Sequence, residues 1–186
     1  MLYKTLHIKS LIIFVGIFTM MSCGTSREVS AEDKSRLDQI INNQFFKIEA
    51  QFARPLTTNA LSQIANAGLL APGDNASRIN LQGNSAYLKF EGDTVSADLP
   101  YFGERQMGGG YSRNTGIEFE GVPKDLEIEK DADKNFYNIK FNISDETENY
   151  QIVLKLYPSL DAFININSSQ RFPIRYDGTL KAIKEK

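Results

Sequence analysis

Alternation of apolar and polar side chains along most of the chain is the feature that most restricts its fold. In the clearest run, from Phe136 to Ile143, Tyr, Ile and Phe occupy every second position after Phe136 and Asn or Lys stands between them. A period of two places the two kinds of side chain on opposite faces of a β-strand. The same pattern predicts further strands at 46–52, 79–81, 87–90, 94–99, 116–120, 126–130, 150–157, 162–167 and 171–176.

The connections between these segments favour antiparallel pairing. Most are short and polar, such as 91–93, 131–135 and 144–148. Short connections cannot return a strand parallel to its neighbour, so consecutive strands should pair as hairpins. We therefore expect a mainly β fold, a single antiparallel meander sheet that is strongly curved or barrel-like, with a two-sheet β-sandwich as the alternative.

One helix should precede the strands. Ser30 and Asp33 resemble a capping box, and Leu37, Ile40 and Ile41 follow at helical spacing, which predicts a helix over 31–42. The segment 56–77 has the small and turn-prone residues of a long connection, within which 60–70 forms either a short helix or a loop.

The first 22 residues have the pattern of a secretory signal peptide. Lys4 and Lys9 precede an apolar run of eleven residues, from Leu11 to Met21, whereas a membrane-spanning helix needs about 20. The sequence Met-Met-Ser-Cys that ends at Cys23 resembles the site at which bacterial lipoproteins are cleaved and lipidated. We expect a signal peptide over 1–22, a lipid-anchored tether over 23–30 and a single β-rich domain over 31–186. The anchor predicts a cell-envelope location, on the periplasm-facing outer membrane.

Composition excludes several kinds of chemistry from the mature chain. The only histidine is His7, inside the leader, and the only cysteine is Cys23, so processing leaves neither imidazole nor thiol. Ser-His-Asp and Cys-His nucleophiles and zinc sites of Cys and His all need one of these groups. We expect no catalytic set, no metal site and no cofactor. The mature chain has 19 basic and 23 acidic residues, a balance that argues against a nucleic-acid partner.

A glycine-rich loop over 101–113 is the candidate ligand site. It combines three consecutive glycines with aromatic and basic side chains, and the candidate residues are Tyr101, Phe102, Arg105, Tyr111 and Arg113. Aromatic rings with guanidinium groups suit a sugar, a carboxylate or a protein surface. The structural alternative is that Tyr101 and Phe102 close one end of the core.

Other polar clusters have simpler structural explanations. Asp131, Asp133 and Asn135 begin like a calcium loop, but Phe136 replaces the required glycine, so a hairpin turn is expected. A loop tip explains the acidic group Asp145, Glu146 and Glu148, and an exposed sheet face explains Arg171 and Arg175. Glu118 and Glu120 share a strand face and are an example of a carboxylate pair for glycoside hydrolysis.

Several short motifs carry a family resemblance. Leu99 to Gly103, together with Gly92 to Val95, Gly116 to Phe119 and the closing segments 168–171 and 174–176, resembles a lipoprotein family of the Bacteroidetes known as domain of unknown function 4251. The resemblance implies secretion and a β-rich fold, and it brings no activity or ligand. We expect a non-catalytic envelope module that binds a protein or glycan partner. The alternatives are a carboxylate-dependent glycan hydrolase and a purely structural envelope protein; the sequence does not indicate an oligomeric state.

Overall fold

The chain is described by a computed structural model that covers residues 29–106, 115–131, 133–145 and 148–185. The helix α2 (Ala31–Asn43) begins at the predicted cap, where Ser30 Oγ accepts a hydrogen bond from the Asp33 amide at 3.1 Å. It ends at Gln44, whose left-handed conformation (φ 55°) turns the chain into the first strand. Leu37, Ile40 and Ile41 are buried, which confirms the predicted apolar face.

The strands follow the alternation read from the sequence. They are β1 (Phe45–Pro55), β2 (Ile79–Asn80), β3 (Tyr87–Glu91), β4 (Thr94–Leu99), β5 (Ile117–Gly121), β6 (Lys124–Asp131), β7 (Phe136–Asp145), β8 (Glu148–Leu156), β9 (Asp161–Ser168) and β10 (Ile174–Ala182). A second helix, α3 (Asn59–Asn66), stands in the long connection between β1 and β2. Within the described residues, all strands belong to one antiparallel sheet, in the order β5-β4-β3-β1-β10-β9-β8-β7-β6, with β2 beside β1.

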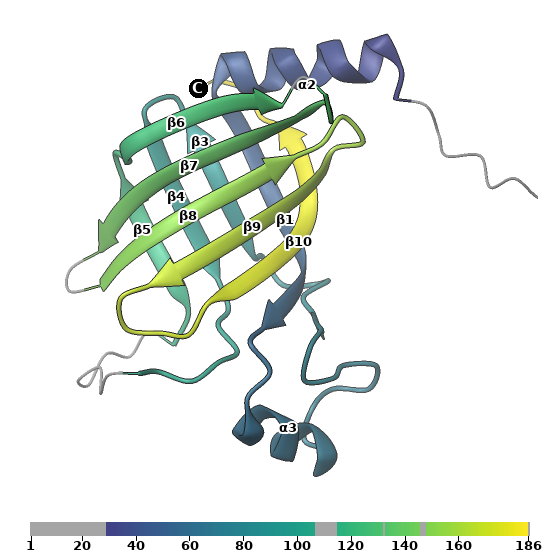
Figure 1. The fold of residues 1–186 in the computed structure, drawn as a ribbon, viewed down its shortest axis with the longest axis vertical. Coiled ribbons are helices and arrows are strands. Elements are labelled where there is room, and N and C mark those ends of the chain that lie inside the picture. The colour runs from purple at the N-terminus through teal and green to yellow at the C-terminus, as the bar shows by residue number, and fades with distance from the viewer. Residues whose placement is uncertain (1–28, 107–114, 132, 146–147, 186) are drawn as a thin grey trace, which may run out of the picture.

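The sheet curls until its two halves face each other. In Figure 1, β6 to β10 form the front of an open half-barrel and β1, β3, β4 and β5 form the back, while α2 lies across one end. The core fills the space between them: Phe90 of β3 stacks on Phe46 at 4.6 Å and meets Phe141 of β7 edge-on at 5.6 Å. The expected curved sheet is confirmed. The halves are not separate sheets of a sandwich, because β1 and β10 are hydrogen-bonded along most of their length.

Two features depart from a simple meander. β1 pairs with β10, which lies more than a hundred residues away, and β5 and β6 do not pair although only Val122 and Pro123 separate them. The sheet stays open between β5 and β6. The expectation that all consecutive strands form hairpins is therefore wrong at this point, where the Pro123 nitrogen has no hydrogen to donate. It is also wrong between β2 and β3, because each of these strands pairs with β1. Among the described residues, no helix is both long and apolar enough to cross a membrane.

Candidate functional site

The start of the predicted ligand loop packs against the end of the half-barrel. Tyr101 and Phe102 contact the core, and the Tyr101 hydroxyl lies 3.0 Å from the carbonyl oxygen of Glu104 and 3.1 Å from that of Phe172. Burial raises the pKa of Tyr101, so its hydroxyl stays protonated and donates at neutral pH. Tyr111 and Arg113 lie outside the described residues, so the structure brings together only the first part of the candidate site.

Arg105 and its neighbours continue as a short paired segment. Arg105 forms an isolated antiparallel bridge with Arg171, the Gln106 amide donates to Gln170 O at 2.8 Å, and the Phe172 amide donates to Glu104 O at 3.2 Å. Gly103 makes this path feasible, because a Cβ there would lie 2.4 Å from the Tyr101 hydroxyl. The first residues of the loop are thus held in place by backbone pairing.

A buried ion pair stands beneath this segment. The Arg171 guanidinium is 4% exposed, and its Nε donates to Glu148 Oε1 at 2.9 Å and Oε2 at 3.1 Å. Its Nη1 donates to the Thr115 carbonyl at 3.0 Å, which ties the chain before β5 to the β9–β10 turn. Glu148 is 7% exposed and also accepts a hydrogen bond from Ser168 Oγ. We refer to Arg171, Glu148, Ser168 and Thr115 as the arginine clamp.

The clamp is electrostatically satisfied. Burial raises the pKa of Glu148, but hydrogen bonds from Arg171 and Ser168 outweigh it, and the net pKa lies below the usual range. Burial and the nearby Glu148 charge raise the pKa of Tyr150. Burial likewise raises the pKa of Tyr176, whose hydroxyl donates to Pro100 O at 2.9 Å. These groups hold the end of the core together and leave no free acid or base among themselves.

Two expectations are corrected here. Arg171 does not share the exposed face of Arg175, because it precedes β10 and turns inward to Glu148, while Arg175 is exposed. Glu148 is not at a loop tip, because it is the first residue of β8 and points to the buried side. Asp145 is exposed as expected, and Glu146 lies outside the described residues.

The remaining acidic candidates lie at the surface. Asp131 Oδ1 accepts the Lys134 amide at 2.9 Å in the turn between β6 and β7, and no metal-binding group of His, Cys, Asp and Glu occurs in the described part of the chain. Glu118 and Glu120 share an exposed face of β5, as expected. They border a shallow hollow of about 350 Å³ and do not face each other across a cleft.

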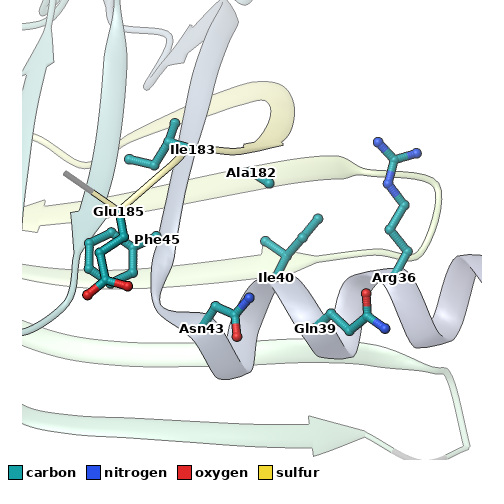
Figure 2. A pocket seen from close by; sticks show the side chains of 8 residues that line it. All are labelled: Arg36, Gln39, Ile40, Asn43, Phe45, Ala182, Ile183 and Glu185. Carbon is teal, nitrogen blue, oxygen red and sulfur yellow. The ribbon is translucent and has the colours of Figure 1, made fainter.

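Two further hollows are each lined by both polar and apolar residues. Tyr101 and Phe102 border a shallow one of about 460 Å³ beside Asp98 and Glu118. A hollow of about 470 Å³ lies between α2 and the end of β10 (Figure 2). Its lining residues are Arg36, Gln39, Ile40, Asn43, Phe45, Ala182, Ile183 and Glu185. We refer to it as the α2–β10 hollow.

Comparison with known proteins identifies the family. The family model described as "Domain of unknown function (DUF4251)" matches residues 28–180. The chain belongs to the DUF4251 family. A crystal structure of a DUF4251 family protein from Bacteroides eggerthii is similar to this one, with a TM-score of 0.55 and 15% identity over 82% of this chain and 89% of that chain. The expected family and β-rich fold are thereby confirmed. Comparison with curated proteins found no match.

Sequence reasoning missed two sets of residues in this DUF4251 protein. Glu148 and Ser168 stand in phase with the buried alternation of β8 and β9, so the strand period itself would have placed them inward. Arg36, Gln39 and Asn43 follow a spacing of three and four residues, which puts them on one side of α2. The partner wall from β10 is more than a hundred residues away in the chain, and no local pattern indicates it.

Proposed function

We propose that this DUF4251 protein is a non-catalytic, lipid-anchored module of the bacterial envelope that binds a protein partner through residues 56–78. This segment, the arm, connects β1 to β2 and contains α3. In Figure 1 it extends from the end of the half-barrel opposite α2. The observation that carries the proposal is the exposed apolar surface of this projecting element.

The arm combines exposed apolar side chains with very little charge. Leu56 is 50% exposed, Ile64 41% and Leu69 74%. Asp74 and Arg78 are the only charged residues of the arm. Charged residues are depleted at the centres of protein interfaces, and clustered exposed apolar groups commonly mark them. An apolar, weakly charged surface on another protein is therefore the complementary partner.

The arm is held in shape by its own contacts. Thr58 caps α3 by accepting the Leu61 amide at 3.2 Å, and Leu61 is buried. Asp74 Oδ1 accepts the Asn80 amide at 2.8 Å, and the Arg78 guanidinium lies 3.6 Å from the centre of the Phe52 ring. Binding a partner would therefore require little ordering of the backbone, which reduces the entropic cost of association.

The expected lipid anchor favours a protein as the partner of the arm, rather than the membrane that would hold the anchor. Seven residue steps separate Cys23 from Ser30 and span at most about 25 Å. A lipid on Cys23 would keep the N-terminal end of α2 near the bilayer, and α3 lies beyond the opposite end of the half-barrel in Figure 1. This geometry favours an arm that points away from the membrane.

The titration properties of the carboxyl groups support a non-catalytic role. Asp38, Glu49 and Glu148 have shifted pKa values, and each is lowered by bonding to a cation. A carboxylic acid that protonates a glycosidic oxygen needs a raised pKa. Lowered values keep these groups ionised at neutral pH, as salt-bridge partners.

Site-directed photo-crosslinking in the native cell tests the arm. A photoreactive residue at Ile64 or Leu69 should give one discrete protein adduct, and the same residue at Lys155 or Asn167, exposed positions on β8 and β9, should not. Introducing Leu56→Ser should weaken the adduct at Ile64. Equal adducts at all four positions, or none at the arm, would contradict the proposal.

Mass spectrometry of the native protein tests the anchor separately. We expect a chain that begins at an acylated Cys23, and a Cys23→Ser variant that leaves the membrane fraction. An unmodified thiol, or a retained leader, would refute the envelope location without bearing on the arm.

A further inference from the structure

We infer that the α2–β10 hollow binds a peptide of about three residues with free amino and carboxyl ends. This inference does not depend on the arm or on the anchor. It rests on the unused polar groups of the hollow, on the order of their charges and on its length.

The polar side chains of the hollow have no partners within the protein. Arg36, Gln39, Asn43 and Glu185 form neither hydrogen bonds nor ion pairs with the part of the chain that the structure describes. Asp38, on the same helix, bonds both Lys130 Nζ at 2.6 Å and the Tyr137 hydroxyl at 2.7 Å. Polar groups on this side of α2 therefore remain available to a ligand.

The charges of the hollow are separated along it. Figure 2 shows Arg36 toward one end and Glu185 toward the other, with Gln39, Ile40 and Asn43 between them. A guanidinium binds a carboxylate with two parallel hydrogen bonds, and a carboxylate accepts hydrogen bonds from an ammonium group. Opposite charges at the two ends thus match the two ends of a zwitterionic peptide.

The middle of the hollow suits a peptide backbone and its side chains. The amides of Gln39 and Asn43 can each donate and accept, as peptide groups do. Phe45 and Ile183, both half-buried, supply an apolar surface for side chains, and Ile40 is largely buried beside them. A fatty acid would leave both amides and Glu185 without partners, whereas a peptide uses all of them.

The length of the hollow sets the size of the ligand. The seven residue steps of α2 from Arg36 to Asn43, which form one wall of the hollow, rise about 10 Å at 1.5 Å per residue. An extended peptide covers about 3.3 to 3.6 Å per residue, so three residues span the same distance. The volume of about 470 Å³ lies in the usual range for small-ligand sites.

Titration calorimetry with Ala-Leu-Ala tests the inference on the mature domain. We expect saturable binding that weakens about tenfold or more when the peptide carries a C-terminal amide, because the bond to Arg36 is lost. Arg36→Gln should weaken binding of the free peptide to the same degree and leave binding of the amidated peptide unchanged. At the other end, N-acetylation of the peptide should weaken binding because the bond to Glu185 is lost. Glu185→Gln should weaken binding of the free peptide to the same degree and leave binding of the acetylated peptide unchanged.

Exposed positions outside the hollow provide controls. Arg175→Gln and Glu129→Gln change the same charges on β10 and β6 and should leave peptide binding unaltered. Circular dichroism of each variant establishes that α2 is retained. No saturable binding at about 10 mM peptide, or equal binding by wild type, Arg36→Gln and Glu185→Gln, would overturn the inference.

Discussion

Replacing Arg171 with methionine should destabilise the protein more than any change to a surface charge. Methionine keeps most of the length of the side chain and removes the guanidinium, with its bonds to Glu148 and Thr115. Glu148 would remain 7% exposed, ionised and without a cation. The cost therefore comes mainly from the charge left behind.

The magnitude follows from the geometry of the clamp. Removing one partner of a buried ion pair costs about 3 to 5 kcal/mol, out of a total stability of about 5 to 15 kcal/mol for a single domain. For a domain of this size, 1 kcal/mol lowers Tm by about 2 to 4 °C, so Arg171→Met should lower Tm by roughly 6 to 20 °C. Arg175→Met, where the exposed Arg175 pairs with an Asp177 that also bonds to Arg54, should cost at most about 1 kcal/mol.

Urea unfolding of the protein, followed by circular dichroism, measures these differences. The double variant Arg171→Met with Glu148→Leu is the decisive comparison. Replacing both members of a buried pair by apolar residues is often neutral, so the double variant should be more stable than Arg171→Met alone. If Arg171→Met unfolds within about 1 kcal/mol of wild type, the clamp does not stabilise the fold and this reasoning is wrong.

The difference in stability between the wild type and Arg171→Met should depend on pH. In the wild type, the pKa of Glu148 is lowered, so its contribution to stability is present above the unfolded value of about 4.3 and is lost as pH falls through the folded value. In Arg171→Met, burial without a cation raises the pKa of Glu148, and protonation relieves the penalty. The stability gap between the two proteins should therefore begin to narrow above the unfolded value of about 4.3, where the variant's Glu148 takes up a proton, and should narrow further below it as the wild type loses its contribution; a constant gap would contradict the assignment.

Three further predictions concern other parts of the fold. Gly178→Ala should cost about 1 to 3 kcal/mol in urea unfolding, because its Cβ would lie 2.3 Å from the Glu49 carbonyl oxygen, and an unchanged midpoint would show that β1 moves freely. Burial and Asp38 raise the pKa of Tyr137 to about 12, so Asp38→Asn should bring the ultraviolet titration of that phenol closer to 10. Leu69→Ser should change the free energy of unfolding by less than about 0.5 kcal/mol, since a larger loss would mean that the arm packs on the body.

Local patterns predicted the elements because one buried face imposes its period on the sequence. The helix expected over 31–42 is observed as Ala31–Asn43, and each predicted strand has a counterpart. The weakest prediction was the last strand, expected over 171–176 and observed as Ile174–Ala182. Pro173 shifts its start, and Gly178 interrupts the alternation beside an irregularity in the β1–β10 register.

Local sequence patterns predicted the candidate site less well than the helices and strands. Tyr101 and Phe102 contact the core, which agrees with the structural alternative, and they also border a hollow, so ligand binding there stays a prediction. Arg171 was misplaced because the alternation expected for a strand does not hold before Pro173. Glu148 was predicted at a loop tip because other acidic residues lie close to it in the sequence. Its position in the alternation of β8 instead places it on the buried face.

The sequence by itself determined which side chains turn inward, since periods of two and of 3.6 are properties of the backbone and need no distant partner. It also determined that the chain would have neither imidazole nor free thiol if the leader is removed and Cys23 is lipidated. Only the tertiary structure decided that β1 pairs with β10, that Arg171 meets Glu148, and that α2 and the end of β10 enclose a hollow. Each of these joins residues far apart in the chain, and their contact depends on how strongly the whole sheet curls.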